Sequence, residues 1–241
     1  MEHLGEIIIR DSLPESTVIW RYFSLDKFLY LILHKELYLS KIMTLDDKKE
    51  GSRPPEFKLL NLYVPIGGVS NKYKASREAL KSKQVRDNQF LVSASNTFVN
   101  CWSMNKSESF ALWCIYTDKN YGIAVKSTIG KLKESIKSNS HSINISRVFY
   151  EPDFTNKFSI DTIVKRKSEF YRFEEEVRLY ISQSDNDSLQ ISVDIELLIT
   201  EIYFSPFMKS NTKIAVKEWL STKSESLSKK VKNSEIELRN I

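Results

Sequence analysis

Three charged residues near the middle of one short stretch could act together on a substrate. The stretch SEFYRFEEEVRLYIS, residues 168–182, alternates apolar and charged residues as a β-strand does. This period-two alternation places Glu174, Glu176 and Arg178 on one face of the predicted strand. Two carboxylates so close together raise the pKa of one of them unless a cation such as Arg178 offsets their repulsion. The alternative is an exposed strand face, on which such charge pairs contribute little.

A second candidate set lies in NCWSMNKSESFALWCIY, residues 100–116. Ser103 is at the end of a predicted strand, and Trp113 and Tyr116 are three residues apart on a predicted helix. A serine beside aromatic rings can hold a planar ring and its amide. Alternatively, the two aromatic residues belong to the core and Ser103 begins a turn.

The third candidate is Arg21, in the predicted strand segment WRYFS. Alternation puts Arg21 on the same face as Ile19 and Phe23, opposite Trp20 and Tyr22. An arginine with apolar neighbours requires an anionic partner. That partner is either a bound ligand or a glutamate that lines the core.

Several common sites are excluded by the sequence. The chain has six glycines and neither the G-x-G-x-x-G nor the G-x-x-x-x-G-K-[ST] motif. Its three histidines and two cysteines do not have zinc-ligand spacing, and there is no nucleophile elbow. Any chemistry must therefore use carboxylates, arginines, hydroxyl groups and aromatic rings.

The elements that would position these residues mix strands and helices without a strict βαβ order. Strands are predicted at 17–24, 37–40, 97–103, 121–127, 143–150, within 168–182, at 189–195 and at 199–206. Helices are predicted at 25–36, 72–86, 108–118 with Ser107 as its cap, 130–138, 156–173 and 211–234. This order predicts an α+β fold, a single domain over 1–241 with a central mixed or antiparallel sheet flanked by helices. Residues 208–241 are expected to pack on it as a charged C-terminal helix.

The overall composition favours a cytoplasmic protein. The chain has 241 residues, 41% of them hydrophobic, and a net charge of +5. This is enough for one sizeable core, and the basic excess permits contact with a polyanion. The N-terminal residues lack the pattern of a signal peptide, and no apolar run reaches membrane-spanning length. We expect no membrane association and two free thiols, Cys101 and Cys114.

Taken together, the motifs resemble a bacterial family, the domain of unknown function numbered twenty-nine seventy-one. The similar segments cover about residues 18–207, and they are WRYFSLDKFLYLILHKELYLS, VNCWSMNKSESFALWCIY, YGIAVKST, VFYEP, KRKSEFYRFEEEVRL and IYFSP. The turn DDKKEG departs from the Asp-Pro-Phe-Glu that is usual in the family, although Glu50 is kept. The family name by itself implies no function.

The order of the three candidate sets also resembles the arginine–serine–glutamate class of ADP-ribosyltransferases. This resemblance implies an ADP-ribosyltransferase-like fold, NAD as the substrate and no metal. The residues that it assigns to NAD are Arg21 at the phosphates or ribose, Trp113 or Tyr116 as a stacking ring, and Tyr22 and Arg178 nearby. The residues that it assigns to catalysis are Glu176 as the catalytic carboxylate, Glu174 to orient the acceptor and Ser103 to support the site. Arg178 would tune both acids.

The biological setting implied by this resemblance is a toxin or phage-defence effector with a protein or nucleic-acid acceptor and an antitoxin or immunity partner. Two other readings remain open. Glu50, Glu174 and Glu176 could bind Mg²⁺ in a nuclease, with Lys165 or Arg166 near a phosphate. Alternatively, the charged residues form a packed ion network in a non-catalytic binding module.

Overall fold

The computed structural model describes residues 5–47, 50, 88, 91–137, 140–151, 160–182 and 188–238, without the side chains of 160–162. The strands are β1 (Ile7–Ile9), β2 (Val18–Phe23), β3 (Glu36–Lys41), β4 (Phe98–Ser103), β5 (Ile123–Thr128), β6 (Ile143–Arg147), β7 (Phe149–Tyr150), β8 (Arg166–Lys167), β9 (Glu176–Ile181), β10 (Leu189–Ser192), β11 (Glu201–Phe204) and β12 (Val231–Asn233). The helices are α1 (Leu25–His34), α3 (Phe110–Tyr116), α4 (Ile129–Ser135), α5 (Ile160–Lys165), α6 (Ile195–Leu198), α7 (Ser210–Lys223) and α8 (Glu225–Lys229). Short 3₁₀ helices are η1 (Ile42–Thr44), η3 (Lys119–Tyr121) and η4 (Glu169–Glu174). The helix predicted at 72–86 lies outside the described residues.

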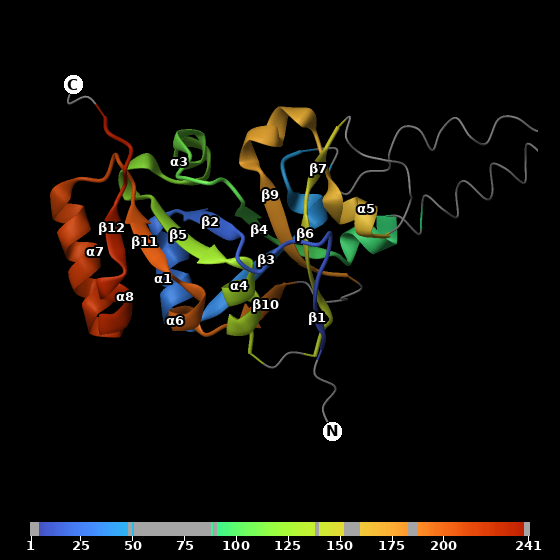
Figure 1. The fold of residues 1–241 in the computed structure, drawn as a ribbon, viewed down its shortest axis with the longest axis horizontal. Helices are drawn as coiled ribbons and strands as arrows, with labels where there is room; N and C mark the ends of the chain where they lie inside the picture. Colours follow the sequence, from blue (N-terminus) through green and yellow to red (C-terminus); the bar gives the residue numbers. More distant parts are fainter. Residues whose placement is uncertain are drawn as a thin grey trace, which may run out of the picture.

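A mixed sheet runs through the molecule in the order β1-β6-β9-β4-β2-β5-β11-β12, with β3 and β10 joined to it through β4 (Figure 1). Its neighbouring strands pair antiparallel, except that β1 pairs with β6 and β11 with β12 in parallel. Strands β2 and β4 are joined by a single register pair, Trp20 with Ser103. In contrast, β2 pairs with β5, and β4 with β9, over six residues each. The predicted α+β class is therefore confirmed.

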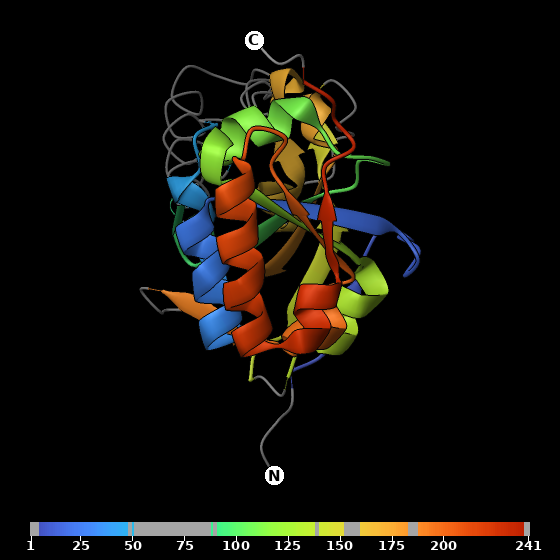
Figure 2. The same cartoon turned by 90° about the vertical axis from the view of Figure 1, so that its left-hand side faces the viewer.

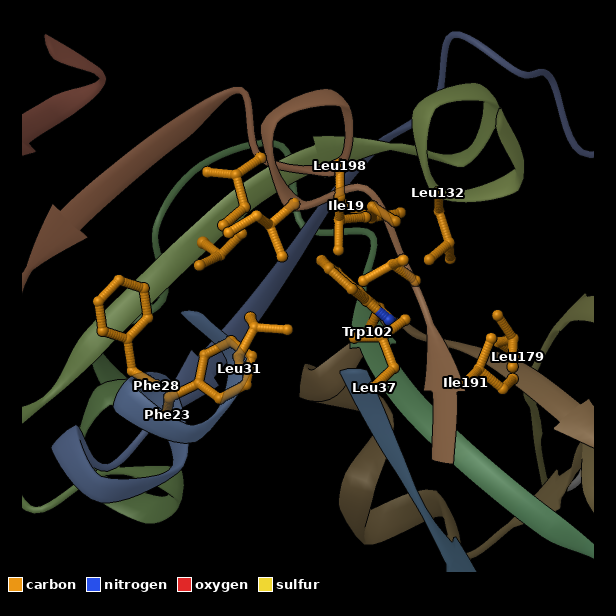
Figure 3. Packing of buried hydrophobic residues seen from close by; sticks show 14 of the residues in the cluster. Ile19, Phe23, Phe28, Leu31, Leu37, Trp102, Leu132, Leu179, Ile191 and Leu198 are labelled. Atoms are coloured by element: carbon orange, nitrogen blue, oxygen red, sulfur yellow. The ribbon is translucent and has the colours of Figure 1, made fainter. Parts of the chain in front are cut away.

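The main hydrophobic core lies on one face of this sheet. Alternation along the strands directs Ile19, Trp102 and Leu179 to this face. Phe28 and Leu31 of α1 pack into the same core near Phe23, whereas Leu179 lies beside Ile191 (Figure 3). Helix α1 begins after Ser24 and ends at His34, and its C-cap residue Lys35 has a left-handed conformation. Its amphipathic sequence thus places one apolar stripe against the sheet.

The opposite face of the sheet is divided into three parts. At one end, α3 packs Leu112 and Trp113 against Trp20 and Tyr22. At the other end, α5 and its neighbours cover Val99 and Tyr180 in a second small cluster. Between the two clusters, β9 carries buried charged side chains. Because apolar clusters enclose this strip, its charges must be paired within the protein.

Two predicted helices are interrupted in the structure. The segment predicted to be helical over 156–173 contains α5, then strand β8, then η4 within its described part. The predicted tail helix 211–234 divides into α7 and α8 and ends in β12, which pairs in parallel with β11. Both stretches are rich in charged residues, so their helical propensity is a weak guide, and tertiary pairing decides the local structure. Of the described helices, none is long and apolar enough to cross a membrane.

Candidate functional site

The buried charged strip of β9 is the candidate functional site. Glu176 and Arg178 point to the same face of β9, and the register pairs them with Ser103 and Cys101 of β4. Glu176 is 3% exposed and Arg178 is 0% exposed. The predicted clustering of these charges on one strand face is correct for Glu176 and Arg178, and the alternative of an exposed face is wrong.

Arg178 donates four hydrogen bonds from its guanidinium group. Its Nε donates to Glu176 Oε1 at 2.8 Å, and one terminal nitrogen donates to Glu176 Oε2 at 2.9 Å. The same nitrogen donates to Glu50 Oε1 at 2.7 Å, and the other donates to the backbone oxygen of Val164 at 2.7 Å. Such a planar, two-pronged pairing is the geometry in which arginine binds carboxylates most strongly. Arg178 therefore holds the two acids together across a wide separation in sequence.

Lys167 is a second buried cation, and sequence reasoning did not single it out. Its Nζ lies 2.5 Å from Glu174 Oε2, 3.0 Å from Glu176 Oε2 and 3.1 Å from Glu50 Oε1. The side chain reaches this position from β8, which pairs with β7. The three carboxylates proposed for a metal thus meet at an ammonium group. Lys167 occupies the point that a divalent cation would take.

The two basic residues beside Lys167 point elsewhere. Lys165, predicted to lie near a phosphate in the nuclease reading, forms an ion pair with Asp11 at 2.9 Å. Arg166 pairs with Glu151. The sequence contains no signal for Lys167, because its segment is predicted to be helical and the strand β8 that directs its side chain to the acids is seen only in the structure.

Glu174 reaches the cluster from a different element than predicted. It ends the 3₁₀ helix η4 and does not lie on β9, so the prediction of one continuous strand face is wrong here. Glu175 follows with a positive φ of 44°, a conformation that is uncommon for a residue other than glycine. This residue is the C-cap of η4, and β9 begins directly after it. Glu174 Oε1 accepts a hydrogen bond of 2.5 Å from the Tyr116 hydroxyl group of α3.

The surroundings push the pKa values of the two acids apart. Burial opposes ionisation of Glu176, but the charges of Arg178 and Lys167 outweigh it and lower the pKa to about 2. Burial and the nearby charge of Glu176 raise the pKa of Glu174, although Lys167 opposes the rise. Glu176 is therefore ionised near neutral pH, and Glu174 is the acid closer to taking up a proton. Acids that are separated in this way often carry out different catalytic tasks.

The buried glutamates in turn change the pKa values of the residues that contact them. Burial opposes the charge of Lys167, but Glu176 and Glu50 outweigh it and raise the pKa. Burial and the hydrogen bond to Glu174 raise the pKa of Tyr116, so its hydroxyl group stays protonated as a donor. Tyr150 supports the strand, because its hydroxyl oxygen accepts the backbone N–H of Glu176 at 2.9 Å.

Ser103 is adjacent to the acids. It lies opposite Glu176 in the β4–β9 register and opposite Trp20 in the β2–β4 register. Its hydroxyl oxygen accepts the backbone N–H of Asn105 at 3.2 Å, so the residue also shapes the turn that follows β4. Opposed residues in such pairs have their side chains about 5 Å apart.

Arg21 lies on the other face of the sheet from Glu176. Its guanidinium carbon is 5.1 Å from the centre of the Phe23 ring and 5.9 Å from that of the Trp102 ring. One of its terminal nitrogens is buried and has no hydrogen-bond partner among the described residues. Burial lowers the pKa of Arg21 to about 10. The salt bridge to a core glutamate, considered from the sequence, is absent from the described residues.

Two of the aromatic residues predicted to bind NAD, Trp113 and Tyr22, belong to the core. Trp113 is fully buried and packs edge-on against Tyr22 with ring centres 5.0 Å apart. The indole N–H of Trp113 donates to Glu108, and the Tyr22 hydroxyl oxygen accepts the backbone N–H of Ser109. Ser109, not the predicted Ser107, caps α3. Trp113 and Tyr22 therefore anchor α3 against the sheet, and they leave no open ring face for a ligand in this structure.

Tyr116 differs from these two because its side chain reaches solvent. It is 46% exposed, and Phe173 and Phe170 of η4 are 41% and 86% exposed. The Asn105 side chain donates to the backbone oxygen of Phe173 at 3.3 Å and thereby links η4 to the turn after β4. Phe173 directly precedes Glu174, the residue to which the Tyr116 hydroxyl group is hydrogen-bonded.

Comparison with known proteins gives a similarity in structure but none in sequence. No family model and no curated protein matches the sequence, so the resemblance to the family of unknown function stays a prediction. The structure of DarT from Thermus sp. 2.9 in complex with ADP-ribosylated ssDNA aligns over 93% of each chain. The identity is 11% and the TM-score 0.38, which does not establish a shared function.

Proposed function

We propose that this protein cleaves the bond between nicotinamide and ribose in NAD, as an ADP-ribosyltransferase or an NAD glycohydrolase. The observation that carries the proposal is the register around Ser103. This serine is opposite Glu176 on β9 and opposite Trp20, the neighbour of Arg21, on β2. Ser103 and Glu176 therefore occur at one level of adjacent strands, and Arg21 is one residue from this level on β2, on the opposite face of the sheet.

The chemistry requires an ionised acid close to the ribose. When the bond between the anomeric carbon and nicotinamide breaks, its electron pair leaves with nicotinamide and positive charge develops on the ribose. An acceptor then forms a bond to this carbon and releases its proton. Glu176, with a pKa of about 2, supplies a negative charge for the transition state at neutral pH. Glu174, with its raised pKa, is the proposed base that receives the proton.

Arg21 is the proposed contact of the NAD diphosphate. A buried guanidinium nitrogen without a partner is costly, and a phosphate oxygen would satisfy it. Arg21 and Glu176 lie on opposite faces of the sheet, so NAD would have to reach both faces. The proposed place is the junction of β2 and β4, because these two strands are joined by a single register pair. Tyr116 is the proposed stacking ring, because it is exposed whereas Trp113 is not.

The acceptor is proposed to be a protein or a nucleic acid, with water as the acceptor of a glycohydrolase. The DarT complex contains ADP-ribosylated ssDNA, so an oligonucleotide belongs among the acceptors to be tested. A role as a toxin or phage-defence effector predicts that expression harms the cell. Glu176→Gln should relieve this harm, and an antitoxin or immunity protein should bind the wild type.

The test is proton NMR of NAD mixed with wild type, Glu176→Gln and Glu175→Gln. Glu175 is the exposed neighbour of Glu176 and gives a matched control. Released nicotinamide with wild type and Glu175→Gln, but not with Glu176→Gln, supports the proposal. Thermal unfolding of each variant is measured in parallel, because loss of the Arg178 partner can unfold the chain. The proposal would be rejected if no protein released nicotinamide and NAD caused no shift in the unfolding temperature. A nucleic-acid-cleaving activity that is lost when divalent metal ions are chelated would instead favour the nuclease reading.

A further inference from the structure

The net charge of the protein is concentrated in one segment. Residues 209–233 contain seven of the 36 lysines and arginines but two of the 31 acidic residues, so this segment alone has the net charge of +5 of the whole chain. The segment forms α7, α8 and β12, which lie together on the face turned toward the viewer in Figure 2. This surface is separate from the buried acids of β9.

The lysines of α7 are placed where they disfavour the helix. Lys209 is the N-cap residue and makes no side-chain cap, and the first turn has no acidic residue. Positive charge at a helix N-terminus opposes the helix dipole. Lys209, Lys213 and Lys217 also repeat every four residues, a spacing at which like charges repel. Within the described residues, the side-chain ammonium group of none of the three has a hydrogen bond or an ion pair, whereas Lys229 and Lys232 of the same segment do. Local stability does not explain this pattern, whereas an anionic partner does.

A groove with an apolar lining lies beside these lysines. Its volume is about 210 Å³, and it lies between α7 and β12. The apolar residues that line it are Phe204, Ile214 and Val231, and the polar ones are Lys213, Lys217, Lys232 and Asn233. Ile214 is 56% exposed although it is aliphatic. Lys232 is already paired with Glu201 at 2.6 Å, so Lys213 and Lys217 are the cations available to a ligand.

We propose that the groove between α7 and β12 binds an acidic, amphipathic segment of a partner protein. An apolar side chain of that segment would contact Ile214 and Val231, and its carboxylates would pair with Lys213 and Lys217. A nucleic-acid backbone would satisfy the lysines but not the aliphatic lining. Single-stranded nucleic acids also bind through exposed aromatic rings, and Phe204, the aromatic residue of the groove, is 2% exposed. A groove that combines aliphatic side chains with lysines therefore favours an acidic peptide over a nucleic acid as the ligand.

The test is selection of a random dodecapeptide phage library on the immobilised wild-type protein. Selected peptides should combine acidic residues with at least one large apolar residue. Fluorescence anisotropy of a synthetic representative should show a loss of affinity of about tenfold or more in Lys213→Glu/Lys217→Glu. A loss should also follow Ile214→Ser, which leaves the charge unchanged. The control is Lys35→Glu/Lys137→Glu, which makes the same change of charge at two exposed lysines near residues 192–193.

Three outcomes would overturn the proposal. Selected peptides that bind the Lys213/Lys217 variant and the wild type equally would place their site elsewhere. A loss of affinity of the same size in the control would indicate a general effect of net charge. Tighter binding of a 20-residue oligothymidylate than of any selected peptide, abolished in the Lys213/Lys217 variant, would make the groove a nucleic-acid surface.

Discussion

Replacing Lys167 by methionine tests the organisation of the buried charges directly. Methionine has nearly the length of lysine, so the change removes the charge and leaves little empty space. Lys167 contacts Glu174, Glu176 and Glu50 at 2.5, 3.0 and 3.1 Å. Without it, Arg178 still pairs with Glu176 and Glu50, but Glu174 loses the cation that pairs with it. Removal of one partner from a buried ion pair costs about 3–5 kcal/mol, so we expect the free energy of unfolding at pH 7 to fall by about 3 kcal/mol.

The loss of stability in Lys167→Met should become smaller as the pH falls. In the variant, burial and Glu176 still raise the pKa of Glu174, and the opposing effect of Lys167 is gone. A carboxyl group whose pKa is raised in the folded state destabilises that state above its unfolded pKa of about 4.3. Uptake of a proton as the pH falls from 7 toward 5 removes this penalty. The difference between the variant and wild type should therefore shrink over that range.

Thermal unfolding followed by circular dichroism at pH 7 and pH 5 measures both effects. For a chain of this size, about 3 kcal/mol corresponds to a decrease in Tm of about 6–12 °C. Lys133→Met is the control, because Lys133 pairs with Glu15 at the surface and should contribute about 1 kcal/mol or less. A Lys167→Met protein as stable as wild type at pH 7, or one whose loss is the same at both pH values, would refute this account of the cluster.

Three further predictions concern the proposed chemistry. Arg178→Gln removes a main cause of the low pKa of Glu176, so the acidic limb of the activity profile should move to higher pH, and an unchanged profile would contradict this role. Tyr116→Phe removes the hydrogen bond to Glu174 from an exposed ring, so kcat for nicotinamide release should fall about tenfold while the free energy of unfolding changes by about 1 kcal/mol or less. Arg21→Met removes a buried donor without a partner, so stability to urea should be kept or raised while KM for NAD rises; unchanged KM would exclude Arg21 from the NAD site.

Local patterns in the sequence predicted most of the central strands. The alternation in β2 and the apolar periodicity in α1 gave the right element at nearly the right residues. Both elements have one buried face, so composition and period agree with burial. The same patterns failed for 156–173 and for the tail, where charged residues prevail and pairing with distant strands sets the conformation.

The candidate site was predicted in part. Glu176, Arg178 and Ser103 do meet, because adjacent antiparallel strands bring them into register. Glu174 arrives by way of the left-handed turn at Glu175, which strand alternation cannot anticipate. The aromatic residues of α3 divide between core and surface, since Trp113 faces the sheet and Tyr116, three residues later, faces the acids.

The sequence by itself determined which residues alternate, which face of each central strand is apolar and which residue types are available for chemistry. These properties depend on neighbours within a few positions, so the period of the pattern reports them. Only the tertiary structure decided that Glu50 and Arg178, 128 residues apart, form a buried pair and that Lys167 completes it. The ionisation of Glu176 and Glu174 follows from that arrangement, because the pKa of a buried acid is set by its distance from other charges in space.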